Sequence, residues 1–122
     1  MQNSAASDPV KLEEDLLRSF QANVIGNIHL FSLLLPLIQK GQAKKVITIT
    51  SGMADIEFIT KYSIAAAAPY SISKAGMNAA VAKFSAQYQK QGILFLGISP
   101  GLVDTGHYDN GKHRSNMYNV QD

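Results

Sequence analysis

Tyr70 and Lys74 stand four positions apart in the segment APYSISKA, residues 68–75. On a helix, this spacing puts a phenol and an ammonium group on one face. A free phenol has a pKa of about 10, and a nearby cation favours its phenolate form. Such a phenol can give a proton to a carbonyl oxygen or take one from an alcohol. The pair therefore predicts acid–base chemistry, although an isolated Tyr-x-x-x-Lys is more often an exposed helical pair.

The segment that carries the pair is predicted to be a helix over residues 69–91. Pro69 suits the first helical position, and Gly92 suits the position just after the last turn. The positive end of the helix dipole then lies close to the Tyr70 oxygen.

Two short apolar runs flank this helix and predict buried strands. Residues 46–50 form a β-branched run, and residues 93–98 form a second apolar run. Their continuity is typical of strands buried on both faces, as in a parallel sheet. Residues 51–68 are predicted to be a loop. Strand, helix and strand together make a βαβ unit.

A long helix is predicted over residues 9–39, before the first strand. Asp8 can cap it, and Pro9 suits its first position. Apolar residues then recur at helical spacing, and residues 24–38 are apolar on most sides. We expect an irregularity around residues 23–26.

These elements predict an α/β fold that is part of a Rossmann-type, doubly wound parallel sheet. Two strands and two long helices leave apolar faces that need further partners. Ligands in this class bind at the carboxyl ends of the strands. Ser51 follows the first strand, Pro100 and Gly101 follow the second, and Tyr70 and Lys74 begin the helix at the same edge. We expect these residues to converge there.

Composition narrows the classes of function. The chain has 122 residues, a net charge of +2 with scattered basic residues, and no cysteine. The length predicts one domain, and the lack of cysteine excludes disulfides and thiol chemistry. The scattered basic residues give no sign of nucleic-acid binding. The longest apolar stretch, residues 28–38, is short for a membrane span, and no signal pattern is visible. His29, His107 and His113 show no metal-ligand spacing with carboxylates. We expect a cytoplasmic protein without a metal.

Four motifs follow one another along the chain: NVIG at residues 23–26, TSG at 50–52, YSISKA at 70–75 and PGLVDT at 100–105. In this order and on these elements, they resemble the short-chain dehydrogenases/reductases. Residues 51–55 and 82–88 are most similar to the fungal members of that family. The resemblance runs from about residue 8 to residue 105 and covers the catalytic half of that family.

The resemblance implies a role for each residue. Tyr70 would be the general acid/base, while NAD or NADP, with NADP favoured, exchanges hydride with a small carbonyl compound or secondary alcohol. Lys74 would favour the phenolate and hold the nicotinamide ribose, and Ser51 would bind the substrate oxygen. Asn23 would place a water for a proton relay. The implied cofactor-binding residues are Tyr70, Lys74, Pro100, Gly101, Val103 and Thr105.

Simpler readings stand beside these roles. Asn23 in an apolar helix fits a buried amide that neighbouring backbone groups satisfy. Thr50, rather than Ser51, is an alternative for the serine role. Ser71 and Ser73 read as helix-surface or packing residues rather than catalytic ones.

The chain also departs from the family pattern. Neither Gly-x-x-x-Gly-x-Gly nor Gly-x-Gly-x-x-Gly occurs in it, so the phosphate-binding half of the cofactor site is not present. We expect a truncated chain: a disordered lead over residues 1–7, a partial domain over 8–105 and a polar, disordered tail over 106–122. The alternative is a non-catalytic fragment or an inactive partial gene product. Such a fragment would pair with itself or with a full-length relative through helices 9–39 and 69–91.

Overall fold

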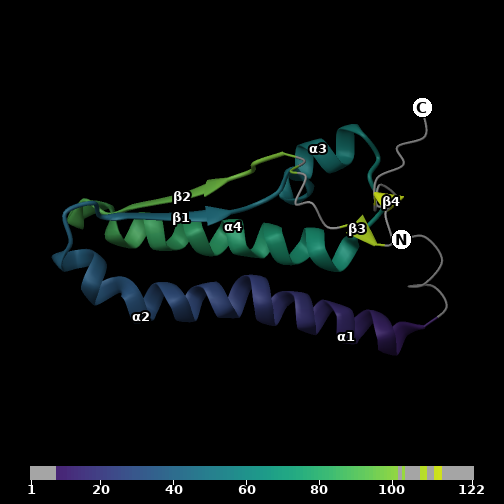
Figure 1. The fold of residues 1–122 in the computed structure, drawn as a ribbon, viewed down its shortest axis with the longest axis horizontal. Coiled ribbons are helices and arrows are strands. Elements are labelled where there is room, and N and C mark those ends of the chain that lie inside the picture. The colour runs from purple at the N-terminus through teal and green to yellow at the C-terminus, as the bar shows by residue number, and fades with distance from the viewer. Residues whose placement is uncertain (1–7, 102, 104–107, 110–111, 114–122) are drawn as a thin grey trace.

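The computed structural model describes residues 8–101, 103, 108–109 and 112–113. A long N-terminal helix, a second long helix and two strands run side by side (Figure 1). In chain order the elements are α1 (Pro9–Phe20), η1 (Gln21–Ile25), α2 (Gly26–Lys40), β1 (Lys45–Ile49), η2 (Gly52–Ala54), α3 (Ile56–Lys61), α4 (Ala68–Tyr88), η3 (Gln89–Gln91), β2 (Leu94–Ile98), β3 (Tyr108–Asp109) and β4 (Lys112–His113).

The N-terminal helix begins where the sequence predicts and is irregular close to the predicted place. The Asp8 side chain accepts a hydrogen bond from the backbone N–H of Lys11 at 3.0 Å, and Pro9 takes the first helical position. Between α1 and α2 the helix widens into the π-helical turn η1, which contains Asn23. The predicted irregularity is therefore confirmed, although it begins two residues earlier than expected.

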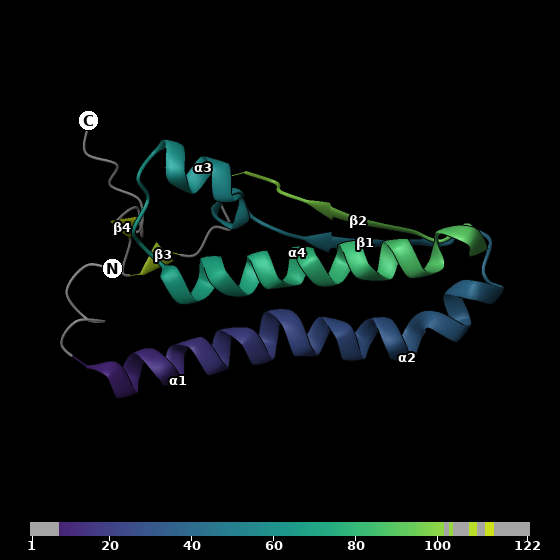
Figure 2. The same ribbon diagram turned by 180° about the vertical axis from the view of Figure 1, so that it is seen from behind.

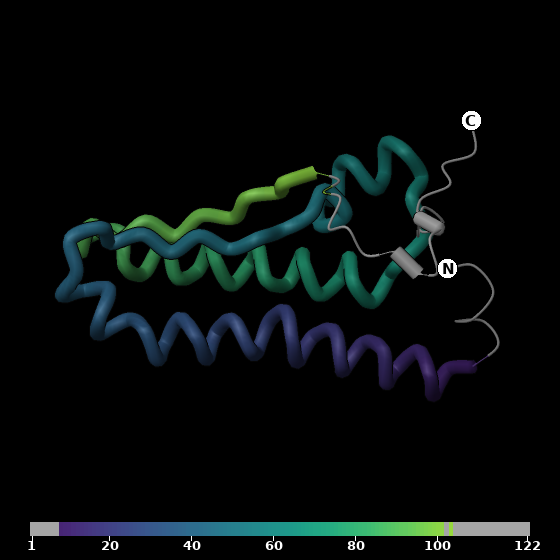
Figure 3. Tube along the Cα trace, in the orientation of Figure 1, coloured from purple at the N-terminus to yellow at the C-terminus, as the bar shows by residue number. Residues whose placement is uncertain are grey.

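The two main strands form a parallel pair, with α4 as the crossover between them. Val46 lies opposite Phe95, and Thr48 lies opposite Gly97. This arrangement confirms the α/β, partial Rossmann-type prediction. In Figure 3 both strands run toward the end of the molecule where α4 begins, so the carboxyl ends of the strands and the first turn of α4 share one edge.

The hydrophobic core lies between α2, the second half of α4 and β2. Phe31, Val81, Ile93 and Phe95 are its buried members. The ring of Phe31 meets that of Phe95 edge to face, with centroids 5.5 Å apart. Such aromatic pairs add about 1 kcal/mol beyond the area that they bury. This cluster holds the sheet against the helices at the end away from Tyr70.

The opposite face of the sheet is exposed. Ile47 and Ile49 on β1 and Leu94, Leu96 and Ile98 on β2 all point away from α4, and Ile49 is 57% exposed. The prediction that the strands are buried on both faces is therefore wrong for the described residues. The long helices cover only one side of the sheet, as Figure 2 shows from behind.

The segment predicted as a loop, residues 51–68, contains two short helical elements, η2 and α3. Ser51 accepts a hydrogen bond from Met53 N at 3.1 Å and begins η2. Asp55 accepts one from Phe58 N at 3.0 Å and begins α3. The loop prediction is wrong here because two short-range caps organise the backbone.

The predicted disordered lead, residues 1–7, lies outside the described residues. The predicted tail, residues 106–122, lies largely outside them too. Within that tail, β3 and β4 pair as antiparallel strands.

The continuous helix Pro9–Lys40 is long and apolar enough to cross a membrane, by length and composition alone. The sequence predicted no span because its longest apolar stretch, residues 28–38, is short. The two findings differ because mean hydropathy is taken over a longer part of the helix than this stretch. Core helices of water-soluble proteins pass the same test, and this helix contacts α4 through α1 and η1.

Candidate active site

Tyr70 and Lys74 lie in the first two turns of α4. The helix begins at Ala68, close to the predicted start. Lys74 Nζ lies 5.8 Å from the centroid of the Tyr70 ring, so the two side chains do share a face. Tyr70 is 37% exposed, which leaves its phenol open to a substrate.

Lys74 ties α4 to the end of the first strand. Its Nζ donates a hydrogen bond to the carbonyl oxygen of Ile49, the last residue of β1, at 2.8 Å. An ammonium group has three donors, so two more remain for a ligand. This bond positions the cation at the carboxyl end of β1, where ligands of this fold class bind.

The two hydroxyls that follow β1 have different partners. Thr50 Oγ1 donates its proton to Asn78 Oδ1 on α4 at 2.7 Å. Ser51 Oγ accepts from Met53 N, so its own proton is not used by that bond. Because a hydroxyl has only one proton to donate, the geometry favours Ser51 over Thr50 as the donor to a substrate oxygen. The turn η2 that follows Ser51 packs against α4.

Asn23 is held at both its side chain and its backbone. Its Nδ2 donates to Ser73 Oγ at 2.9 Å, and its carbonyl oxygen accepts from Asn27 Nδ2 at 2.8 Å. A side-chain hydroxyl from α4, rather than neighbouring backbone, therefore satisfies this amide. That contact connects the π-helical turn to the helix that carries Tyr70.

Ser73 is the residue that the sequence reasoning missed. Its hydroxyl also donates to the carbonyl oxygen of Tyr70 at 2.8 Å, and the residue is only 1% exposed. It is therefore not a surface residue. Its spacing of three from Tyr70 was a usable signal, because serine side chains bond to backbone carbonyls one turn earlier.

The segment after β2 approaches the same edge. Thr50 N donates to the carbonyl oxygen of Ile98 at 2.9 Å, which joins the ends of β1 and β2. Pro100, Gly101 and Val103 follow and are exposed. Gly101 has a φ of 72°, a conformation that glycine adopts without strain. Thr105 lies outside the described residues.

The residues present fit the nicotinamide half of an NAD(P) site. Lys74 offers two further donors for a ribose diol. Gly101 presents bare backbone, because a Cβ built there would meet nothing within 4 Å. A phosphate-binding half would need a glycine-rich loop, which the sequence does not contain.

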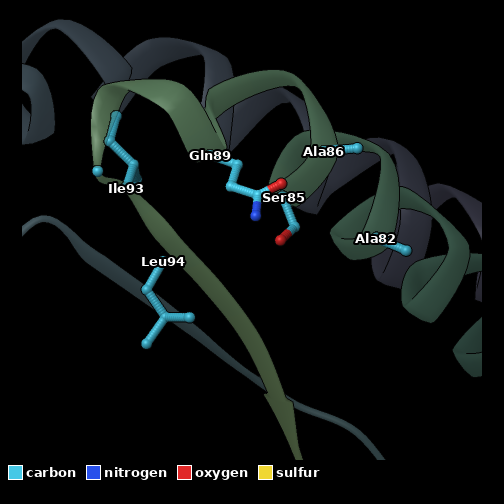
Figure 4. A pocket seen from close by; sticks show the side chains of 7 residues that line it. Ala82, Ser85, Ala86, Gln89, Ile93 and Leu94 are labelled. Carbon is cyan, nitrogen blue, oxygen red and sulfur yellow. The ribbon is translucent and has the colours of Figure 1, made fainter.

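One hollow among the described residues lies away from this site. It is an open depression of about 510 Å³ lined by residues from the last turns of α4 and the start of β2. Figure 4 shows its lining, including Ala82, Ser85, Gln89 and Leu94. These residues are at the opposite end of α4 from Tyr70, so the hollow is not part of the site. Among the described residues, no group of three or more histidine and acidic side chains gathers to hold a metal.

Comparison with known proteins identifies close relatives. A family model described as short chain dehydrogenase matches residues 2–116. The chain is 56% identical over 104 residues to "Short chain dehydrogenase virK" of Hypocrea virens, a match that covers 85% of this chain. It is 50% identical over 107 residues to "Short-chain dehydrogenase/reductase iacC" of Pestalotiopsis fici, covering 87% of this chain. It is 48% identical over 96 residues to "Short-chain dehydrogenase/reductase AacuF" of Aspergillus aculeatus, covering 78% of this chain.

The matched regions cover 38%, 39% and 36% of these three relatives. No solved structure matches the chain. The family model spans residues 2–116 of the sequence, and the three relatives named here are fungal, as predicted. The chain belongs to the short-chain dehydrogenase family.

Proposed function

We propose that this site carries out the proton transfer of an NAD(P)-dependent oxidoreductase that interconverts a small carbonyl compound and its secondary alcohol. One observation carries the proposal: the Tyr70 phenol and the Lys74 ammonium share a face of α4, and Lys74 is anchored at the carboxyl end of β1. Family membership supports the same reaction class.

Each residue has a distinct task in the proposed reaction. Tyr70 gives its phenolic proton to the carbonyl oxygen during reduction, or takes the alcohol proton during oxidation. Lys74 places its positive charge on the same face of α4, 5.8 Å from the centroid of the Tyr70 ring. Ser51 donates a hydrogen bond to the same substrate oxygen and stabilises the charge that develops on it.

A nicotinamide cofactor, NADP in preference to NAD, would supply or accept the hydride. Lys74 would hold its ribose, and the exposed backbone of Pro100 and Gly101, with Val103 and Thr105 after it, would line the nicotinamide side. We place the reaction in the cytoplasm, where reduced nicotinamide cofactors are available.

The proposal is tested by removing the phenolic oxygen. In a chimera, the matched 104 residues of this chain replace their counterparts in the Hypocrea virens relative. We expect Tyr70→Phe to lower NADPH-dependent carbonyl reduction by about 100-fold or more, because acid–base catalysis contributes on that order. Tyr88→Phe is the matched control, since its ring stays in the aromatic cluster with Phe84 and Phe95.

Thermal unfolding shows whether each variant is folded. If the chimera reduces carbonyl compounds and the Tyr70→Phe variant reduces them equally well, Tyr70 is not the acid/base and the proposal fails.

A second candidate function is non-catalytic pairing with another copy or with a full-length relative. The exposed leucines of α2 support it: Leu33 is 76% exposed and Leu37 is 67% exposed. They lie one turn apart, with Leu30 and Leu34 beside them, and form an apolar stripe that favours contact with another helix. Co-purification of a full-length relative with the 122-residue chain discriminates this function from the enzymatic one.

A further inference from the structure

Ser73 connects Asn23 with Tyr70, the acid/base of the proposed reaction. Its hydroxyl accepts a hydrogen bond from Asn23 Nδ2 at 2.9 Å and donates one to the Tyr70 carbonyl at 2.8 Å. The residue is 1% exposed, so water does not compete for these bonds. A continuous path of hydrogen bonds therefore runs from the π-helical turn η1 into the turn of α4 that carries Tyr70.

Only a group that both donates and accepts can complete this path. A serine hydroxyl does both through one atom, whereas an alanine methyl does neither. Loss of the hydroxyl leaves the Asn23 amide without its acceptor in a half-buried site, where an unpaired donor is costly.

The same two elements are in contact one turn further along α4. A Cβ built at Gly76 would lie 3.1 Å from Val24 Cγ2, so η1 and α4 already approach as closely as their side chains allow. Ser73 and Gly76 are three positions apart, so they lie on the same face of α4, toward η1. A displacement of η1 is therefore transmitted to the backbone of Tyr70.

Two anchors hold the Tyr70 turn from opposite sides. Lys74 bonds it to the end of β1 through Ile49, and Ser73 bonds it to η1 through Asn23. We propose that Ser73 is a positioning residue for the reaction, because it fixes the Tyr70 turn against Asn23 while Lys74 fixes it against the sheet. This inference rests on the proposed function of Tyr70.

The helix provides a matched control in Ser71. This residue is also buried, at 7% exposure, but among the described residues its Oγ has no hydrogen-bond partner. Ser71→Ala and Ser73→Ala thus remove the same atom from buried positions in one helical turn, and only the second breaks the path. Asn23→Ala breaks the same bond from its other end.

The first readout needs no activity. The 122-residue chain is labelled with 3-fluorotyrosine, and the Tyr70 signal in the fluorine NMR spectrum is assigned by its loss in Tyr70→Phe. We expect Ser73→Ala and Asn23→Ala to move this signal to a similar extent, and the double variant to move it no further. Ser71→Ala should leave it in place, and none of these changes should move the Tyr88 signal.

The second readout is turnover in the chimera. Ser73→Ala should lower kcat by about tenfold, which corresponds to about 1.4 kcal/mol, while KM for NADPH stays unchanged; Ser71→Ala should change neither. An unmoved Tyr70 signal in folded Ser73→Ala, or an equal shift in Ser71→Ala, overturns the proposal. If Ser73→Ala does not fold, Asn23→Ala decides by the same criteria. An inactive parent chimera counts against the proposed function alone, because the fluorine signal still tests the positioning.

Discussion

The hydroxyl groups of Thr50 and Ser51 follow β1, and they make different hydrogen bonds. Thr50 donates its hydroxyl proton to Asn78 Oδ1 and so joins the end of the strand to α4. Ser51 receives a bond from Met53 N, and this bond does not use the proton of its hydroxyl. The sequence left these two residues as alternatives, since both follow the strand. The choice depends on Asn78, 28 positions away from Thr50, and no local pattern predicts that contact.

This division predicts different effects of removing each hydroxyl. Ser51→Ala should lower kcat of the chimera by about 100-fold, as for other donors to a developing oxyanion, with little change in stability. Thr50→Val should instead lower the free energy of unfolding by about 1 kcal/mol, because Asn78 loses a partner. Turnover and thermal unfolding, measured on both variants, check the assignment. A larger loss of kcat in Thr50→Val than in Ser51→Ala would reverse it.

The crossing of the N-terminal helix with α4 depends on a residue without a side chain. Val24 and Phe20 would lie 3.1 Å and 3.4 Å from a Cβ at Gly76. Val24 is buried and β-branched, so its side chain has little freedom to move away. The π-helical turn and α4 are therefore held at their closest approach beside Asn23 and Ser73.

Gly76→Ala should for this reason destabilise the protein. Overpacking lowers the free energy of unfolding by about 1–3 kcal/mol, whereas the higher helix propensity of alanine raises it by about 1 kcal/mol. We expect a net loss of about 1 kcal/mol, measured by thermal or urea unfolding. The effect should shrink in a Val24→Ala background, where the opposing methyl groups are absent. A stabilised Gly76→Ala variant would show that the helices separate without cost.

Some of these elements are predictable from sequence because their ends carry strong local signals. Asp8 and Pro9 begin the first helix, and the left-handed Gly92, with a φ of 73°, follows the last helical turn before β2. The short helices after Ser51 were missed because they depend on single caps rather than on apolar periodicity. The hydrogen bond between Ser73 and Asn23 was missed because 50 positions separate the two residues.

Two apolar surfaces of the 122-residue chain are exposed. One face of its sheet and the outer stripe of α2 are exposed, with Ile47 at 54% and Leu33 at 76%. Surfaces of this kind mark contacts with other protein segments. The sequence predicted this need for partners from the small number of strands. In the structure, the exposed apolar side chains of the sheet lie on its face away from α4. The candidate residues Ser51, Tyr70 and Lys74 all belong to this chain. Their part in cofactor binding can therefore be tested on the chain itself.

The most direct test is therefore thermal unfolding of the 122-residue chain with and without millimolar NADPH. A ligand that binds only the folded state raises the melting temperature by mass action. We expect a rise of about 2 °C or more, which Lys74→Met abolishes and the exposed control Lys83→Met retains. A cooperative transition that NADPH does not shift, or one that shifts equally in Lys74→Met, would contradict a cofactor site beside Tyr70.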